Sequence, residues 1–584
     1  MAATLAAALS LVACSGTSGD VPDRSGRDVP DDTSQNGTGQ NGTGQNGTGQ
    51  NGTGQNGTGQ NGTGQNGTGQ NGTGGPTDDT DRNDADLVVR PGAVLAEINP
   101  LTLGTNVPAW LLPDLLTDAR FVELTRQLGT TLLRLPGGSW SNGYHWLACE
   151  REDESGCFAT WGAAPSDLLG FMHATGLPGM WTAAFSGTAH EAAAAVAFFN
   201  GAIDDQRPIG VDRNGHDWGV VAEWAALRAE RGFAEPVPIT YWEIGNEIYG
   251  ALGSAGPACA PWGWEHVWTC DPAEYVLGDD EHDGLLAFAE AMTAVDPTIQ
   301  IGAVGVGDRG EWNDWDDTVI GTAGDVIDFY VVHHYGSDGD RSAEELLDVP
   351  RAAWPRITAD MRQVFVDHGL AADLPIAVTE HNMVSFIDAD DARLMPSAAN
   401  AFYLAETIGQ LILSGVPIAN QWNLMNGRAD NGSDYGLVDG TTMQRAPAYY
   451  ALALWARAGT ALVEVDVNAD LGDLRVYGLR SADGLARLLV LNPTGSGVPA
   501  TIGVEGDPAA AGGPGPVVVD AHVVAASSLD ATTMTFNGAA QPAPDLSDPP
   551  ARVAPEPPAD GAPGGRWSYH FAPFSLTLLE WHGE

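Results

Sequence analysis

The sequence predicts an α/β protein in which a (β/α)8 TIM barrel is followed by a C-terminal antiparallel β-sandwich. The first observation is that short β-rich runs alternate eight times with helix-like stretches from residue 96 onward, as the strands and crossover helices of a barrel do. The second is a change near residue 458 to short alternating segments separated by Gly, Pro and Asp, which is typical of a sandwich. We therefore expect the barrel over 87–457 and the sandwich over 458–584.

Each predicted barrel strand is a short, mainly apolar run. These runs lie near 97–107, 131–138, 178–187, 238–247, 299–307, 326–336, 375–382 and 417–425. The helix candidates include Asp114–Leu128, His190–Asn200, Leu285–Val295, Pro396–Leu413 and, after the last run, Ala446–Ala456. This order predicts parallel strands that follow one another around a closed ring.

The predicted sandwich consists of short segments whose apolar residues alternate with polar ones. They include LRVYGLR, ARLLVLN, GPVVVDAHVV and TLLEW. A separate strand candidate, Ala85–Leu95, precedes the barrel and is a candidate member of the same sandwich.

The N-terminal region predicts export. Residues 1–13 are an apolar run that is followed directly by Cys14. Leu11-Val12-Ala13-Cys14 resembles a bacterial lipobox with Cys14 as the lipidated residue, and an ordinary signal peptide is the alternative. Residues 15–86 read as a disordered linker, because 35–74 are eight copies of Gln-Asn-Gly-Thr-Gly. We expect an extracellular cell-surface lipoprotein, or a secreted protein, that contacts a membrane only through its lipid anchor.

Four further cysteines form two close pairs, Cys149 with Cys157 and Cys259 with Cys270. In an exported protein such pairs predict disulfides. A zinc site is the alternative, but spacings of eight and eleven residues differ from the paired C-x-x-C of common zinc sites.

Charge excludes several classes of function. The chain has 26 Lys+Arg against 76 Asp+Glu and a formal net charge of −50, so nucleic acid is an unfavourable partner. Every one of the 26 cationic residues is an arginine, which excludes a Schiff-base lysine and a P-loop lysine.

Two glutamates stand at predicted strand ends, where barrels carry their functional groups. Glu247 ends the fourth run and Glu380 lies near the end of the seventh. Strands about 4.8 Å apart and tilted about 36° form a ring of roughly 7 Å radius, which leaves the two carboxylates about 5–6 Å apart. That separation is closer to the 5–5.5 Å or so of retaining glycosidases than to the wider gap of inverting ones.

Two motifs carry a resemblance to a known family. Trp-Glu-Ile-Gly-Asn-Glu at 242–247 resembles the strand-four Asn-Glu signature of clan A glycoside hydrolases. Arg-Leu-Pro-Gly-Gly at 134–138, with Gly-Tyr-His-Trp at 143–146, is similar to a segment of family 51 α-L-arabinofuranosidases. The resemblance covers about 97–584. It implies that Glu247 is the acid/base and Glu380 the nucleophile, and we expect burial and the second carboxylate to raise the pKa of Glu247.

The resemblance also implies a set of substrate-binding residues. Asn246 corresponds to the donor to the sugar 2-hydroxyl, and Tyr335 and Arg134 correspond to residues that orient the nucleophile. His333 and Gln421 correspond less specifically, and Asn106 and Trp422 are added because they lie at predicted strand ends. The full set of candidates is Asn246, Arg134, His333, Tyr335, Asn106, Gln421 and Trp422. Aromatic residues in the predicted loops are candidates either for stacking on sugars or for the core: Trp140, Tyr144, Trp146, Trp262, Trp264, Trp268, Trp312 and Trp315.

The chain departs from the family at three places that bear on substrate. Gly104-Thr105-Asn106 and Ser139-Trp140 replace an acidic residue and an asparagine that hold the furanose, and no tryptophan follows Glu380 closely. We expect a retaining hydrolase of neutral polysaccharide or oligosaccharide, first of the α-L-arabinofuranosidase type. Other clan A specificities (β-xylosidase, endo-β-glucanase, β-glucuronidase) and a non-catalytic carbohydrate-binding surface lipoprotein remain alternatives.

No cofactor is expected. The histidines at predicted strand ends are candidates for hydrogen bonding rather than for metal binding, because no H-E-x-x-H motif occurs. The sequence sets no oligomeric state.

Overall fold

A computed structural model describes residues 85–153, 156–157, 160–252, 259, 263–505, 517–555 and 566–583. The predicted signal peptide, Cys14 and the predicted linker up to residue 84 lie outside the described residues, as does Trp262. Among the helices that the structure describes, none is long and apolar enough to cross a bilayer.

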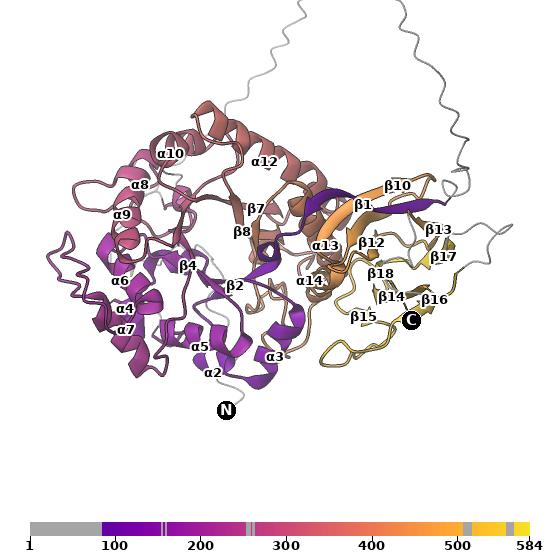
Figure 1. The fold of residues 1–584 in the computed structure, drawn as a ribbon, viewed down its shortest axis with the longest axis horizontal. Coiled ribbons are helices and arrows are strands. Elements are labelled where there is room, and N and C mark those ends of the chain that lie inside the picture. The colour runs from indigo at the N-terminus through magenta and orange to yellow at the C-terminus, as the bar shows by residue number, and fades with distance from the viewer. Residues whose placement is uncertain are drawn as a thin grey trace, which may run out of the picture. The chain divides into compact units, whose positions relative to one another are not determined.

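The first domain is the predicted barrel, closed by parallel strands β2 to β9 in chain order (Figure 1). The strands are β2 (Gly104–Pro108), β3 (Leu133–Gly137), β4 (Gly179–Ala183), β5 (Tyr241–Ile244), β6 (Gln300–Val304), β7 (Phe329–Ser337), β8 (Ile376–Val384) and β9 (Ile418–Gln421). Strand β8 is buried along its whole length, as expected when a parallel strand has side chains inside the barrel and helices outside. The predicted fold class is confirmed.

Helices surround the barrel and connect its strands (Figure 1). They are α2 (Pro113–Leu116), α3 (Ala119–Leu128), α4 (Trp146–Glu150), α5 (Pro165–Thr175), α6 (Ala189–Asn200), α7 (Val221–Glu230), α8 (Pro272–Leu277), α9 (Leu285–Val295), α10 (Trp315–Ala323), α11 (Ala343–Leu346), α12 (Val349–Asp367), α13 (Ala398–Leu413) and α14 (Pro447–Ala458). Short 3-10 turns occur at Pro100–Leu103, Ser139–Gly143, Ile248–Gly250 and Ile387–Ala389.

The predicted helix Asp114–Leu128 is two helices, α2 and α3. The chain breaks between them because the side chain of Asp118 accepts hydrogen bonds from the backbone N–H groups of Arg120 and Phe121. This is an N-cap, which begins a new helix. The predicted helix Leu285–Val295 is present with the same bounds as α9.

The second domain is a curled sheet with the order β15-β14-β18-β12-β11-β10-β1-β13-β17, in which β16 pairs with β14. Its strands are β1 (Leu87–Glu97), β10 (Ala461–Val467), β11 (Arg475–Arg480), β12 (Ala486–Asn492), β13 (Val498–Val504), β14 (Val517–Ala525), β15 (Thr535–Phe536), β16 (Ala551–Val553), β17 (Arg566–Phe571) and β18 (Ser575–Gly583). Trp567 and Trp581 come from strands far apart in this order, yet their rings lie 5.7 Å apart, so the sheet folds onto itself as a sandwich.

The predicted barrel range of 87–457 begins too early. Strand β1 pairs antiparallel with β10, from Leu87 opposite Val467 to Glu97 opposite Ala461, and it pairs parallel with β13. Its side chains Leu87 and Val89 belong to the buried core of the sandwich. The apolar strand β1 fills the position between β10 and β13 in the sheet. This agrees with the interpretation of Ala85–Leu95 as a strand of the sandwich. The β1–β13 pair also makes the sandwich not wholly antiparallel.

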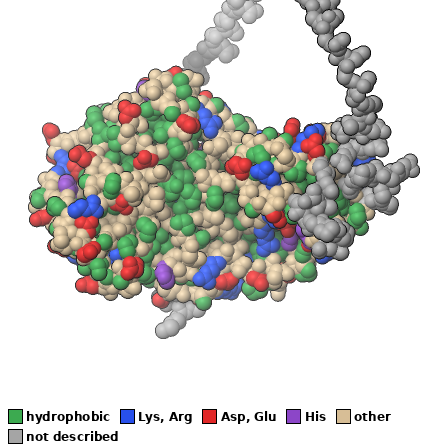
Figure 2. All heavy atoms as spheres, viewed as in Figure 1, with side chains coloured by type: hydrophobic (Ala, Val, Ile, Leu, Met, Phe, Trp, Pro, Cys, Tyr) green, Lys and Arg blue, Asp and Glu red, His purple; other side chains and the backbone are tan. Residues whose placement is uncertain are grey.

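The two domains share an interface rather than a flexible junction. Tyr477 on β11 donates a hydrogen bond of 2.8 Å to the buried carboxylate of Glu406 on α13. On the face drawn in Figure 2, acidic and arginine side chains are interspersed over the outer surface, and hydrophobic side chains gather over the middle of the barrel.

Both predicted disulfides are present. Cys149 on α4 is bonded to Cys157 in the segment after β3, and Cys259 is bonded to Cys270 in the segment after β5. Both bonds therefore constrain βα loops at the C-terminal end of the barrel, where the polar strand ends also lie.

Replacing Cys149 and Cys157 together by serine should lower the free energy of unfolding by about 2–3 kcal/mol, because the unfolded chain regains the entropy of an open loop. Urea unfolding of the variant and of the wild type measures this difference. A disulfide reductant should lower the stability of the wild type further than that of the variant, since the variant keeps only the Cys259–Cys270 bond. Equal stability of the two proteins would contradict the expected contribution.

Candidate active site

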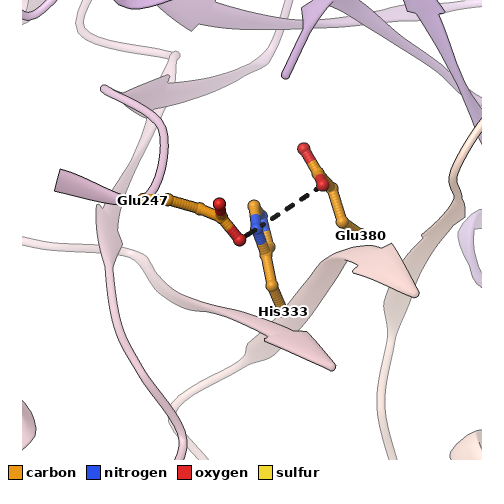
Figure 3. A group of neighbouring side chains, drawn as sticks. All are labelled: Glu247, His333 and Glu380. Carbon is orange, nitrogen blue, oxygen red and sulfur yellow. Dashed lines mark hydrogen bonds and ion pairs between the residues drawn. The ribbon is translucent and has the colours of Figure 1, made fainter. Parts of the chain in front are cut away.

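Glu247 and Glu380 meet at the C-terminal end of the barrel, as the sequence predicts (Figure 3). Glu380 lies on β8, and Glu247 follows β5 after a turn in which Gly245 has φ 84° and Glu247 itself has φ 44°. A non-glycine residue in this left-handed region costs about 1–2 kcal/mol, and such conformations cluster at functional sites. One carboxylate oxygen of each glutamate and one ring nitrogen of His333 all lie within 4.8 Å of one another.

Glu380 is held by two donors. The guanidinium of Arg134 donates to its Oε1 at 2.8 Å, and the hydroxyl of Tyr335 donates to its Oε2 at 2.7 Å. A carboxylate that accepts from a cation and from a hydroxyl is fixed in one orientation and is favoured in its ionised form.

Glu247 has different partners. Trp264 donates to its Oε2 at 2.6 Å, Tyr249 donates to its Oε1 at 3.2 Å, and Nδ1 of His333 lies 2.8 Å from the same oxygen. The side chain of Glu247 is 15% exposed, whereas that of Glu380 is 6% exposed. Glu247 is therefore the carboxylate with better access to water and to a leaving group.

His333 lowers the pKa of Glu247, which the sequence predicts to be raised. Burial raises the pKa of Glu247, but the hydrogen bond and the charge of His333 outweigh it and hold that pKa below its usual range. Burial lowers the pKa of His333, but the charges of Glu380 and Glu247 outweigh it and raise that pKa. The expected rise in the pKa of Glu247 is thus wrong for the free site. His333, whose pKa is raised, lies within hydrogen-bond distance of Glu247 and is a candidate proton donor to it.

Burial also raises the pKa of Glu380, against the opposing charges of His333 and Arg134.

The pH profile of kcat/KM should be a bell. Glu380 must be ionised to attack, so activity should fall with decreasing pH through a value above 4.5, the ordinary pKa of a glutamate. The proton held by His333 and Glu247 should be lost above 6.5, the ordinary pKa of histidine, so activity should fall again at higher pH. Full activity at pH 4, or an alkaline limb below pH 6, would contradict this assignment of the protons.

Arg134 organises the floor of the site. It is fully buried, and it donates to Glu243 at 2.6 Å, to the Asn246 side-chain carbonyl at 2.8 Å and to that of Asn106 at 3.0 Å. Burial lowers the pKa of Arg134, but the charges of Glu243 and Glu380 outweigh it and raise that pKa. Breaking such a buried pair leaves an uncompensated charge, so Arg134 fixes both the nucleophile candidate and Asn246.

The predicted substrate-binding residues divide into two groups. Those that line a cavity of about 670 Å3 around the glutamates are Asn246, His333, Tyr335 and Trp422. The others, Asn106, Arg134 and Gln421, lie behind the lining. The Asn106 amide donates to backbone carbonyls of Thr379 and Gln421, and the Gln421 carbonyl accepts from Thr105. Because protein groups satisfy these polar atoms, the structure places these three residues as supports rather than as substrate contacts.

The predicted loop aromatics divide in the same way. Trp140, Trp264 and Trp312 line the cavity, whereas Tyr144, Trp146 and Trp315 are buried in the core. Trp268 stacks on His282 at a ring distance of 4.3 Å.

Two buried carboxylates of the site, Glu243 and Glu265, were not predicted from the sequence. Glu243 is paired with Arg134 and accepts from the hydroxyls of Thr182 and Thr379 at 3.1 Å each. The sequence did contain a signal for Glu243, because a charged residue in the buried strand β5 requires a partner. Glu265 accepts from Ser139 and from the side chains of Asn142 and Asn246. Burial raises the pKa of Glu265 well above its usual range; its loop position carried no sequence signal.

Glu247, His333 and Glu380 also offer one ligand atom each to a cation. The hydrogen bonds from Trp264, Tyr249, Arg134 and Tyr335 already occupy the carboxylates, however, and a guanidinium nitrogen 2.8 Å from Glu380 repels a metal ion. The arrangement is suited to acid–base and nucleophilic chemistry without a metal.

Sequence comparisons match part of the chain. No family model matches. The intracellular exo-α-(1→5)-L-arabinofuranosidase of Halalkalibacterium halodurans is 28% identical over 235 residues, which are 38% of this chain and 40% of that protein. Intracellular exo-α-(1→5)-L-arabinofuranosidase 1 of Bacillus subtilis is 27% identical over 232 residues, with the same two coverages. The chain therefore spans about two fifths of the length of these curated relatives.

Comparison with solved structures extends over both domains. The α-L-arabinofuranosidase of Thermotoga maritima, solved as an arabinose complex, has a TM-score of 0.61 and 20% identity over 85% of this chain and 99% of its own. The chain is similar in fold to family 51 arabinofuranosidases. The family 51 α-L-arabinofuranosidase of Bifidobacterium longum has a TM-score of 0.61 and 17% identity, covering 85% of this chain and all of its own. These likenesses confirm the predicted architecture of a barrel with a sandwich.

Proposed function

We propose that the protein is a retaining glycoside hydrolase of the α-L-arabinofuranosidase type that acts on neutral polysaccharide or oligosaccharide. The observation that supports it most is that one carboxylate oxygen of Glu247 lies within 4.8 Å of one of Glu380, because retaining enzymes place their carboxyl groups about 5–5.5 Å apart and inverting ones about 6.5–9.5 Å apart. The different partners of the two glutamates suit two different roles.

In the first step ionised Glu380 attacks the anomeric carbon. Arg134 and Tyr335 hold its two oxygens. Glu247 receives the proton of His333 across their 2.8 Å contact and passes it to the leaving oxygen. The glycosidic bond breaks, and the sugar becomes an ester of Glu380.

In the second step Glu247 acts as the base. It takes a proton from a water molecule, which attacks the anomeric carbon and displaces Glu380, so that the product keeps the configuration of the substrate. The side-chain amide of Asn246 is held by Arg134 through its oxygen and by Glu265 through its nitrogen. Its second amide hydrogen remains to donate to the sugar 2-hydroxyl.

The charge of the cavity favours neutral sugars. Its lining residues include Glu247, Glu380, Asp338 and Asp388, and the described lining contains no arginine. A uronate would bring a further negative charge into this cavity without an arginine to pair with it, and His333 already contacts Glu247.

A panel of aryl glycosides tests the proposed function. Purified residues 87–584 should hydrolyse an α-L-arabinofuranoside faster than a β-xyloside or a β-glucoside, and any of these faster than a β-glucuronide. A higher kcat/KM on another neutral glycoside would show that the protein has one of the other clan A specificities instead. Absence of turnover together with binding of glycans would favour a carbohydrate-binding protein.

We also propose that the protein is anchored at the cell surface through Cys14. The support is the lipobox-like sequence Leu11-Val12-Ala13-Cys14, followed by a long polar repeat. Wild-type protein should fractionate with membranes, and Cys14→Ser should not be retained there. Identical fractionation of the two proteins would refute the anchor.

A further inference from the structure

Two neighbouring residues of the active site, Asn246 and Glu247, meet two neighbouring residues of the segment after β5, Trp264 and Glu265. The indole of Trp264 donates to Glu247 Oε2 at 2.6 Å. The side-chain amide of Asn246 donates to Glu265 Oε1 at 3.0 Å. We call Asn246-Glu247 the reacting pair and Trp264-Glu265 the supporting pair. Each member of the supporting pair therefore contacts one member of the reacting pair.

Backbone hydrogen bonds attach the supporting pair to the turn that follows Glu247. The N–H groups of Trp264 and Glu265 both donate to the carbonyl of Gly250, at 2.8 and 2.9 Å, and the N–H of Leu252 donates to the carbonyl of Glu265 at 2.9 Å. A Cβ atom at Gly250 would come within 2.7 Å of the Trp264 ring. The glycine therefore leaves the space in which this ring lies beside Glu247.

Glu265 acts through its neighbours. Its side chain is fully buried, and it is not among the described residues that line the cavity. Besides Asn246, the hydroxyl of Ser139 and the side-chain amide of Asn142 donate to it at 2.7 Å each. Asn142 in turn donates to the backbone carbonyl of Asn246 and accepts from its backbone N–H. Glu265 therefore supports Asn246 both directly and through Asn142.

These contacts determine which way the side-chain amide of Asn246 faces. Arg134 donates to its oxygen at 2.8 Å, and Glu265 accepts from its nitrogen. A reversed amide would place an oxygen against the carboxylate of Glu265 and an NH2 group against the guanidinium of Arg134. One orientation alone satisfies both partners, and it fixes the direction of the second amide N–H.

We propose that the supporting pair positions the reacting pair for the reaction. Glu265 fixes the direction in which Asn246 donates to the sugar 2-hydroxyl. Trp264 fixes the carboxylate of Glu247 for proton transfer to the leaving oxygen. Both are positioning residues, and their effect is large because a misplacement of about 1 Å in an active site can cost about 100-fold in rate. The proposal rests on the proposed function and adds two residues to its site.

The first test replaces Glu265 by glutamine in the full chain, which keeps the size and shape of the side chain. The two oxygens of Glu265 accept from two amide nitrogens that can only donate, those of Asn142 and Asn246, whereas a glutamine has one oxygen. Glu265→Gln must therefore break one of these contacts. The ratio of kcat/KM for an aryl glycoside to kcat/KM for its 2-deoxy analogue should fall by about tenfold, equivalent to about 1.4 kcal/mol.

Control variants show whether Glu265 acts through Asn246. Glu274→Gln changes an exposed glutamate at the start of α8 and should keep the wild-type ratio. Adding Glu265→Gln to Asn246→Ala should not lower the ratio further, because the group on which Glu265 acts is then absent. If Glu265→Gln does not fold, Asn142→Ala removes the second route from Glu265 to Asn246 and should lower the same ratio. An unchanged ratio in the folded variant would overturn the role of Glu265, even if both kcat/KM values fall together.

The second test replaces Trp264 by phenylalanine, which removes the indole N–H and keeps an aromatic ring. The ratio of kcat/KM for an unactivated aryl glycoside to kcat/KM for an activated one should fall by about tenfold, because the unactivated leaving group alone needs the proton of Glu247. Gly250→Ala should lower this ratio in the same direction, since its methyl group displaces the Trp264 ring. Equal losses on both leaving groups would overturn the role of Trp264.

The two variants should give crossed results. Glu265→Gln should leave the leaving-group ratio unchanged, and Trp264→Phe should leave the 2-hydroxyl ratio unchanged. Substitutions that merely loosen the loop would move both ratios or neither, and that result would contradict the two separate roles. An active wild type whose ratios persist in both variants would refute this inference alone. A wild type that hydrolyses no glycoside would refute the proposed function and this inference with it.

Discussion

Glu380→Ala should abolish turnover for every leaving group, with kcat lower by a factor on the order of 10⁵. The reason is that no covalent intermediate forms without this carboxylate, however easily the leaving group departs. The measurement is the steady-state rate on an activated aryl glycoside and on an unactivated one. Both rates should fall together.

A control variant separates loss of chemistry from loss of fold. Glu464 is an exposed glutamate on β10 of the sandwich, so Glu464→Ala should keep full activity. Arg134 retains Glu243 as a partner in Glu380→Ala, and the thermal transition of that variant should therefore remain cooperative. If Glu380→Ala keeps wild-type activity, the active site lies elsewhere.

Glu247→Ala should separate the two chemical steps. An activated aryl leaving group needs no proton, so the first step should proceed, whereas loss of the base slows the second by roughly 10²–10⁴-fold. Small anions such as azide fit the space left by the side chain and should accelerate the slow step. The measurement is the burst of released phenol, followed by the steady rate with and without azide.

The configuration of the azide product decides between the roles. An azide that attacks the ester of Glu380 gives a glycosyl azide with the configuration of the substrate. Azide rescue of Glu380→Ala with retained configuration, and no such rescue of Glu247→Ala, would reverse the assignment.

The barrel and the positions of the two glutamates could be predicted because both depend on local patterns. Apolar runs separated by amphipathic stretches define the strands, and the C-terminal end of a barrel strand is a place that topology alone identifies. Glu247 and Glu380 therefore had predictable neighbours even before the distances were known. The disulfides were predictable for the same reason, since short spacing in one loop limits the possible partners.

The remaining features depend on contacts between segments far apart in the chain. Strand β1 joins a sheet whose other strands begin more than 350 residues later, and no local pattern fixes that partner. The lowered pKa of Glu247 comes from His333 on another strand. Glu265 reaches Asn246 from a loop, a contact that no local pattern fixes.

The most direct test of the retaining mechanism is to trap the intermediate on Glu380. A 2-deoxy-2-fluoro glycoside with an activated leaving group destabilises both transition states, while the good leaving group still allows the first step. Mass spectrometry of the digested protein should then find one added sugar on the peptide that contains Glu380, and none on the peptide that contains Glu247. A protein that hydrolyses its substrate with inversion and carries no sugar on Glu380 would contradict the mechanism.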